Sequence, residues 1–142
     1  ERVCGCPFLC GLRYAFTHGP WYVLCFPLLP GGTLQVQLDE RTSHLGGLPI
    51  AEVRWIGAQL VLSLTAMHDL DLLHRDIKPS NLMLRRNGYL VLCDLGLCAD
   101  LAAKAPTTKT GTRGYWAPEC IERAPQDFAA DWWSVGVVLW YA

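Results

Sequence analysis

The chain has 142 residues, of which 51% are hydrophobic and 18% charged, and its formal net charge at pH 7 is −1. This length suffices for one domain with a core of its own, and the near-zero charge gives no indication of nucleic acid or an anionic membrane as a partner. The longest apolar stretches, around residues 56–67 and from 132 to the end, fall short of the roughly 18–20 residues that a membrane-spanning helix needs.

The first 30 residues predict two short strands, at about 10–16 and 21–26, joined by a turn at residues 17–20. Without further neighbours such a pair would leave a bare sheet edge. A short helix is expected over residues 33–40, followed by a loop over the polar, glycine-containing stretch 41–48.

A long helix is expected next. Pro49 suits its first helical position, and we expect it to end near residues 68–73, just before His74. Apolar residues recur along it at intervals of three and four, which is typical of a core-facing stripe: Ile50, Val53, Ile56, Leu60, Leu64 and Met67. We assign the stripe to core packing, and His74 to a structural role.

The pair Asn87-Gly88 lies between two short apolar runs. This is the strongest local signal for a β-hairpin, and it indicates a type I′ turn, which needs positive φ at both central residues. The hairpin would bring its two ends, Asn81 and Asp94, next to each other. An ordinary surface hairpin with polar ends is the alternative interpretation.

The run His-Arg-Asp-Ile-Lys-Pro-Ser-Asn occupies residues 74–81, and Asp94-Leu95-Gly96 begins thirteen residues after Asn81. Phosphoryl transfer needs a nucleophile held in line, cations on the phosphate oxygens and ligands for those cations. Asp76 could orient and deprotonate a hydroxyl, and Lys78 could sit on the transferring phosphate. Asn81 and Asp94 could hold Mg²⁺ through hard oxygens. The run resembles the catalytic loop and metal-binding segment of a eukaryotic-type protein kinase.

Three further segments resemble protein kinases in the same order along the chain. Residues 21–34 resemble the strand and hinge that hold adenine, residues 110–119 the end of the activation segment, and residues 131–139 the start of the central helix of the large lobe. The resemblance implies a partial α+β protein-kinase-like fold. Residues 1–30 would be the hinge-side remnant of the small lobe, and residues 31–142 the first part of the mainly helical large lobe.

No glycine-rich loop, ATP-binding lysine or glutamate partner of that lysine is found in the sequence. We therefore expect a kinase domain truncated at both ends, inactive by itself. For the full-length parent, the resemblance implies ATP- and Mg²⁺-dependent phosphorylation of serine and threonine on protein substrates. A non-catalytic kinase-like scaffold is the alternative, and Ala117-Pro118-Glu119 argues against a small-molecule kinase.

The resemblance also implies finer assignments. Lys78 and Thr112, which would bridge aspartate and lysine, favour a serine/threonine kinase. Asp-Trp-Trp-Ser at residues 131–134 favours the basophilic group of cyclic-nucleotide-dependent and related kinases. Asp131 would accept hydrogen bonds from the catalytic-loop backbone. In the hinge, the nucleotide would contact Cys25, Phe26 and Leu28.

Arg75 precedes the catalytic aspartate, and in kinases with this arrangement the arginine commonly binds a phosphate on the activation segment. Thr108, eleven residues before Glu119, is the expected phosphorylation site, modified by an upstream activating kinase. An unmodified polar loop is the alternative.

The seven cysteines are an odd number, scattered along the chain, and the N-terminus carries no basic-then-apolar signal pattern. Reduced thiols and a cytoplasmic, intracellular protein are therefore expected. Cys4, Cys6 and Cys10 could suggest zinc, but C-x-C-x₃-C has no second cysteine pair or paired histidine, so free thiols are favoured. Cys93 could be attacked by an electrophile if its thiolate were accessible.

Overall fold

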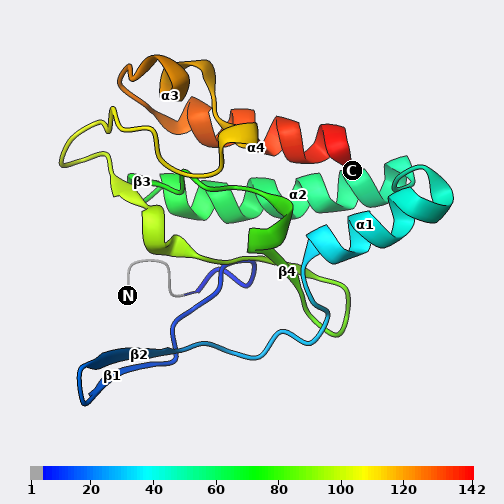
Figure 1. Cartoon of the computed structure of the whole chain (residues 1–142), viewed down its shortest axis with the longest axis horizontal. Coiled ribbons are helices and arrows are strands. Elements are labelled where there is room, and N and C mark those ends of the chain that lie inside the picture. Colours follow the sequence, from blue (N-terminus) through cyan, green and yellow to red (C-terminus); the bar gives the residue numbers. More distant parts are fainter. Residues whose placement is uncertain (1–4) are drawn as a thin grey trace.

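The computed structural model of the protein describes residues 5–142, apart from the side chains of residues 42–45. Its longest helices are α1 (Leu34–Leu45), α2 (Ile50–His68) and α4 (Phe128–Tyr141), with the short α3 (Pro118–Glu122) before α4. Helix α2 contacts α4 on one side and strand β5 on another, so it lies in the middle of the body (Figure 1). The strands are β1 (Tyr14–His18), β2 (Trp21–Cys25), β3 (Leu72–Leu73), β4 (Leu82–Leu84), β5 (Leu90–Leu92) and β6 (Ala99–Asp100).

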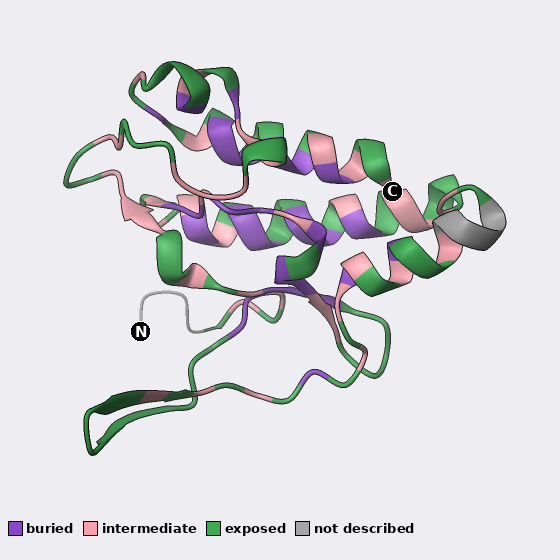
Figure 2. Cartoon of the chain, in the orientation of Figure 1, coloured by how far each residue is buried: buried purple, intermediate pink, exposed green. Residues whose placement is uncertain are grey.

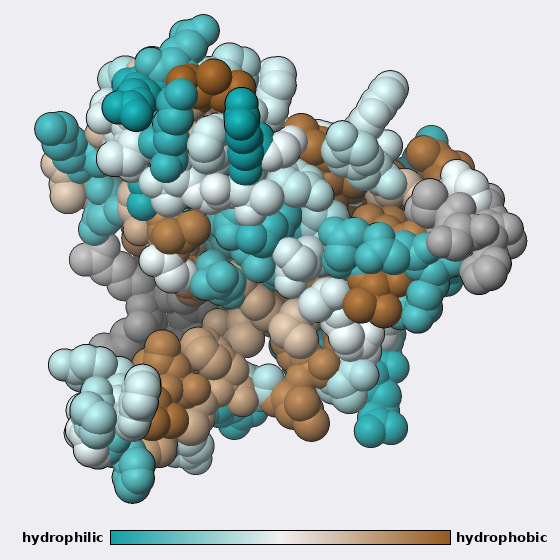
Figure 3. Space-filling view, in the orientation of Figure 1, coloured by the Kyte–Doolittle hydropathy of each residue, from teal (hydrophilic) through white to brown (hydrophobic). Residues whose placement is uncertain are grey.

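Strands β1 and β2 form an antiparallel hairpin in which Tyr14 pairs with Cys25 and His18 with Trp21. The hairpin projects from the helical body (Figure 1). Large apolar side chains on both of its faces are exposed, and part of this hydrophobic surface is visible on the side drawn in Figure 3. The first strand was predicted at about residues 10–16, which is too early, and its last two residues, 17 and 18, were assigned to the turn. The chain reverses only at Gly19, whose φ of +57° a residue without Cβ adopts readily.

Helix α1 begins after Thr33, whose side-chain oxygen accepts the Val36 N–H at 3.4 Å as an N-cap. It continues to Leu45 and ends at Gly46, which has left-handed geometry. The expected loop over residues 41–48 is therefore wrong for residues 41–45. Arg41, within the helix, donates to both carboxylate oxygens of Glu52 at 2.9 Å and so links α1 to α2.

Helix α2 ends at His68 as predicted, and Pro49 precedes it as the N-cap residue instead of opening it. The C-terminal part of the predicted stripe is buried, from Ile56 to Met67, whereas Ile50 is exposed. The buried side chains meet α1, α4 and the β4–β5 hairpin in one core (Figure 2). By length and composition alone α2 could also cross a membrane, but the core helix of a soluble protein passes the same test.

The hairpin predicted around Asn87-Gly88 is present, with Leu82 opposite Leu92. Its turn is not type I′, because Gly88 has a φ of +80° but Asn87 is not among the residues with positive φ. Instead the Gly88 N–H donates to Arg85 O at 3.0 Å and the Arg85 N–H to Tyr89 O at 2.8 Å. This is the pattern of a three-residue loop closed by a left-handed glycine, which also keeps the strands in register.

Candidate active site

The expected catalytic loop, residues 74–78, runs from β3 to the short 3₁₀ helix η1 (Pro79–Asn81), and it is fixed by a residue of α4. Asp131, which is fully buried, accepts the backbone N–H groups of His74 at 2.8 Å and Arg75 at 2.9 Å. His68 Nε2 lies 3.0 Å from the same carboxylate. Arg75 has a φ of +69°, a conformation unfavourable for a residue with a side chain. The buried carboxylate therefore supports a strained turn just before Asp76.

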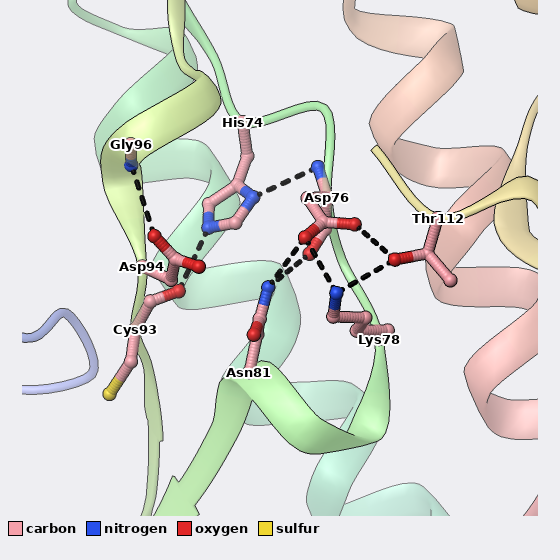
Figure 4. A network of polar contacts seen from close by, with 8 residues as sticks. All are labelled: His74, Asp76, Lys78, Asn81, Cys93, Asp94, Gly96 and Thr112. Carbon is pink, nitrogen blue, oxygen red and sulfur yellow. Dashed lines mark hydrogen bonds and ion pairs between the residues drawn. The ribbon is translucent and has the colours of Figure 1, made fainter. Parts of the chain in front are cut away.

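His74 is fully buried, and both of its ring nitrogens have partners (Figure 4). Nδ1 accepts the Asp76 N–H at 3.2 Å and Nε2 lies 3.2 Å from the carbonyl oxygen of Cys93. Burial lowers the pKa of His74 more than the nearby Asp131 carboxylate raises it. A neutral imidazole with both nitrogens engaged ties the catalytic loop to the residue before Asp94, in agreement with a structural role.

Asp76 is 5% exposed and lies at the centre of a polar network (Figure 4). Its Oδ1 accepts the Thr112 hydroxyl at 2.7 Å, and its Oδ2 lies 2.9 Å from Lys78 Nζ and accepts Asn81 Nδ2 at 3.0 Å. Lys78 Nζ also donates to Thr112 Oγ1 at 2.7 Å. Burial raises the pKa of Asp76, but the hydrogen bonds from Lys78 and Thr112 outweigh it, so the pKa lies below its ordinary value and the carboxylate is ionised at neutral pH.

Asn81 and Asp94 come together at the open ends of the β4–β5 hairpin, where the Cys93 N–H donates to Asn81 O at 2.9 Å. Asp94 is exposed and has left-handed geometry, and its Oδ1 accepts the Gly96 N–H at 3.3 Å. The amide nitrogen of Asn81 donates hydrogen bonds to Asp76, and within residues 5–142 its side-chain oxygen accepts none. An amide oxygen beside an exposed carboxylate is a donor set that suits Mg²⁺.

Gly111 allows the activation segment to approach the catalytic loop. The sequence of residues 110–119 did not indicate this role. Its φ is +88°, and a Cβ built on it would overlap the carbonyl oxygen of Arg75 and lie 3.3 Å from Asp76 Oδ1. Only glycine fits such a backbone contact. The close approach places the next residue, Thr112, on the Asp76 carboxylate.

The structure also brings Arg75 and Thr108 together. Arg75 Nη1 donates to Thr108 Oγ1 at 3.3 Å, and its Nε donates to Leu97 O at 2.7 Å. Thr108 Oγ1 lies 3.0 Å from Thr110 Oγ1. A second residue that the sequence did not single out, Gln126, donates its side-chain amide to Thr108 O at 2.9 Å.

The predicted hinge residues are not drawn into this network. Phe26 and Leu28 are 52% and 90% exposed, and Cys25 pairs with Tyr14 in the projecting hairpin. A cavity of about 200 Å³ is lined instead by Pro27 and Leu29, which alternate with Phe26 and Leu28 along the chain, together with Leu9, Cys10 and Val91. Nucleotide contact by Cys25, Phe26 and Leu28 therefore stays a prediction.

The cysteine residues have separate surroundings. Cys10 is buried in a cluster with Leu29 and Val91, Cys6 Sγ contacts Leu62 O at 3.9 Å, and Cys4 lies outside the described residues. Within the described residues no group of three or more His, Cys, Asp or Glu side chains could hold a metal ion. Burial and the neighbouring Cys10 raise the pKa of the Cys93 thiol to about 12, so its reactive thiolate is scarce at neutral pH.

Comparison with known proteins gives a consistent result. The family model described as the protein kinase domain matches residues 2–142. The chain is 35% identical over 135 residues to beta-adrenergic receptor kinase 1 of Homo sapiens, covering 94% of this chain and 19% of that protein. It is 38% identical over 138 residues to serine/threonine-protein kinase Sgk3 of Rattus norvegicus, covering 94% and 27%. The chain thus spans about a fifth to a quarter of the length of these curated relatives.

Proposed function

The chain belongs to the protein kinase family, and from this premise we propose that its full-length parent transfers the γ-phosphoryl group of ATP to serine and threonine hydroxyls of protein substrates. Serine/threonine specificity is supported by Lys78 and Thr112, which share a 2.7 Å hydrogen bond beside Asp76. It is supported also by the similarity to a protein named as a serine/threonine kinase. An open cavity of about 490 Å³ beside Pro79, lined by Leu38, Tyr115 and Tyr141 among others, offers room for a substrate polypeptide.

The observation that carries this proposal is the fixed position of the Asp76 carboxylate, held through one oxygen by Thr112 and through the other by Lys78. A substrate hydroxyl that donates to this carboxylate is held in line with the phosphorus atom and can give up its proton as the new bond forms. Because the pKa of Asp76 lies below its ordinary value, the carboxylate contributes mainly through orientation and less as a strong base.

The reaction needs positive charge near the phosphate. Lys78 would supply one such charge, and the ends of the β4–β5 hairpin would supply the ligands for a metal ion. The Lys78 ammonium can contact the transferring phosphate, and Asn81 and Asp94 would hold Mg²⁺ through their oxygens. When bound there, Mg²⁺ would neutralise charge on the phosphate oxygens. The Asn81 amide nitrogen donates to Asp76 at 3.0 Å, so the same side chain joins the metal site to the carboxylate that orients the hydroxyl.

The experiment that tests this function is phosphate transfer by the full-length parent from labelled Mg·ATP to peptide pools that differ only in Ser, Thr or Tyr. We expect transfer to serine and threonine and its loss in Asp76→Asn. Preference for tyrosine would contradict the proposed specificity. Binding of Mg·ATP without transfer, in every phosphorylation state of the protein, would favour the alternative, a non-catalytic scaffold.

The isolated 142-residue chain is expected to be inactive, because its sequence contains no glycine-rich loop, ATP-binding lysine or glutamate partner. The measurement is transfer from labelled ATP to a generic basic protein by the purified chain. Transfer that Asp94→Ala abolishes would contradict the expectation.

The 3.3 Å contact between Arg75 Nη1 and Thr108 Oγ1 supports a regulatory site at Thr108, modified by an upstream activating kinase. A phosphate there adds about −1.5 to −2 charge and three acceptor oxygens beside the guanidinium. Comparison of Thr108→Ala and Arg75→Ala with the wild-type protein, before and after phosphatase treatment, tests the site. The parent is proposed to act in the cytoplasm, supported by the six cysteines the structure describes, all of which are free.

A further inference from the structure

Gln126 ties the activation segment to the beginning of α4 through both its backbone and its side chain. It is 2% exposed. Its side-chain Nε2 donates to Thr108 O at 2.9 Å, and its backbone N–H donates to Pro106 O at 2.9 Å. The next residue, Asp127, is the N-cap of α4 and accepts the Ala129 N–H at 2.8 Å. Gln126 therefore lies just before the N-terminus of α4, and its side chain contacts the activation segment from this fixed position.

Besides its contact with the neighbouring Thr110, Thr108 has a contact with the catalytic loop that is anchored on the same helix. Asp131 of α4 accepts the backbone N–H of Arg75 at 2.9 Å, and the Arg75 guanidinium donates to the Thr108 hydroxyl at 3.3 Å. Thr108 is thus held at two points, its carbonyl oxygen by Gln126 and its hydroxyl by Arg75. Because both holders are fixed to α4, the contacts form a closed ring that sets Thr108 relative to the catalytic loop.

The two contacts differ in strength. The hydroxyl contact is long and exposed, so water competes for both partners. The Gln126 contacts come from a buried amide, and a buried polar group that loses its partner carries the full cost of desolvation. With an unmodified hydroxyl at Thr108, most of the constraint on this part of the segment therefore comes from Gln126.

We propose that Gln126 is a positioning residue that holds Thr108 in register with Arg75 before Thr108 is phosphorylated. The inference rests on the proposed function, since it assigns a role within the same site. The segment from Pro106 to Thr112 is then ordered without phosphate, and Thr112 already lies on Asp76. When Thr108 is phosphorylated, Arg75 is already in position to bind the phosphate, so little further ordering of the segment is required.

The test uses Gln126→Met in the full-length parent, because methionine keeps the length of the side chain but cannot donate. In phosphatase-treated protein we expect kcat to fall roughly 5- to 30-fold, with little change in the affinity for Mg·ATP. Phosphorylation at Thr108 should restore most of the loss, so the ratio of phosphorylated to unphosphorylated kcat rises. Gln126→Glu should behave in the same way, because a carboxylate cannot donate to Thr108 O.

Gln59→Met is the matched control. Gln59 is also 2% exposed, and its amide bridges Leu90 N–H at 2.7 Å and Trp55 O at 3.0 Å, in the core and outside the segment. The control loses comparable buried hydrogen bonds and should lower the melting temperature. It should leave the ratio of phosphorylated to unphosphorylated kcat unchanged.

A second measurement does not depend on catalysis. Trypsin cleaves after Lys109, which is exposed within the segment, and the cleavage rate in unphosphorylated protein reports how tightly the segment is held. We expect faster cleavage at Lys109 in Gln126→Met than in wild type or Gln59→Met. Faster cleavage in a parent that transfers no phosphate in any form would support the positioning role and contradict the proposed function.

Two results would overturn the inference. One is an unchanged cleavage rate at Lys109 together with an unchanged kcat ratio in Gln126→Met. The other is an equal loss of kcat with and without phosphate on Thr108, which would make Gln126 a support of the fold as a whole.

Discussion

Thr112 Oγ1 lies 2.7 Å from Asp76 Oδ1, although 36 residues separate the two in the chain. The same oxygen accepts a 2.7 Å hydrogen bond from Lys78 Nζ. One hydroxyl thus orients both the carboxylate that is proposed to bind the substrate hydroxyl and the ammonium that is proposed to contact the phosphate. The order of the activation segment is therefore coupled directly to the geometry of the catalytic loop.

Thr112→Val keeps the shape of the side chain and removes this hydroxyl. We expect kcat of the full-length parent to fall by about 10- to 150-fold, the range for a hydrogen bond to charged groups worth about 1.5–3 kcal/mol in the transition state. Thr112→Ser, which retains the hydroxyl, should keep most of the activity. Steady-state kinetics measure the effect, and a fully active Thr112→Val would show that the bridge is not used.

Asp76→Asn and Asp94→Asn should each abolish turnover, but for different reasons. Asp76 is proposed to act on the hydroxyl, so its substitution should lower kcat by roughly 10²–10⁴-fold and leave Mg·ATP binding nearly intact. Asp94 would hold the metal, so its substitution should also weaken Mg²⁺-dependent nucleotide binding. Titration calorimetry with Mg·ATP separates the two roles, and equal losses of affinity would contradict the assignment.

Gly111→Ala should disrupt the active site. A Cβ at this position would overlap Arg75 O, and its φ of +88° is unfavourable for alanine, so the segment must move away from Asp76. We expect kcat to fall at least about tenfold. Gly136→Ala is the control, because a Cβ there meets open space on α4 and alanine should stabilise the helix by about 0.5–1 kcal/mol. Equal activity of the two variants would show that the backbone contact is dispensable.

His74 should make the stability of the protein depend on pH. Burial lowers its pKa in the folded state below the ordinary value of 6.5, so below pH 6.5 the unfolded chain binds a proton that the folded chain does not. The free energy of unfolding should therefore fall as the pH drops from 6.5 towards the folded-state pKa, with a slope of up to about 1.4 kcal/mol per pH unit.

Urea unfolding of wild-type protein and His74→Gln between pH 5 and 8 measures this slope. The variant will be less stable throughout, but its stability should depend less steeply on pH below 6.5. Identical slopes would show that other groups carry the dependence.

The fold class could be predicted from the sequence, and so could the parts of the site that depend on local chemistry. The hairpin around Gly88 is specified by its turn and brings Asn81 beside Asp94. The length of α1 was underestimated because the polar stretch after Glu40 shows no apolar periodicity, although Gly46 provides a C-cap.

The remaining features depend on contacts between distant segments. The overlap that a Cβ at Gly111 would make with Arg75 exists only once the activation segment folds back. Gln126, likewise, has no sequence pattern to distinguish it from a surface glutamine. In the expected hinge, Pro27 and Leu29 line the cavity whereas Phe26 and Leu28 are exposed, and no sequence pattern indicates this alternation.

The anchoring of the catalytic loop by Asp131 determines when this loop can form during protein synthesis. Asp131 follows His74 by 57 residues, so at about 5–20 residues per second the ribosome needs roughly 3–11 s to add it after His74. During that interval the N–H groups of His74 and Arg75 have only water or transient partners. The nascent chain therefore acquires its catalytic geometry late, after α4 has been translated and has docked on α2.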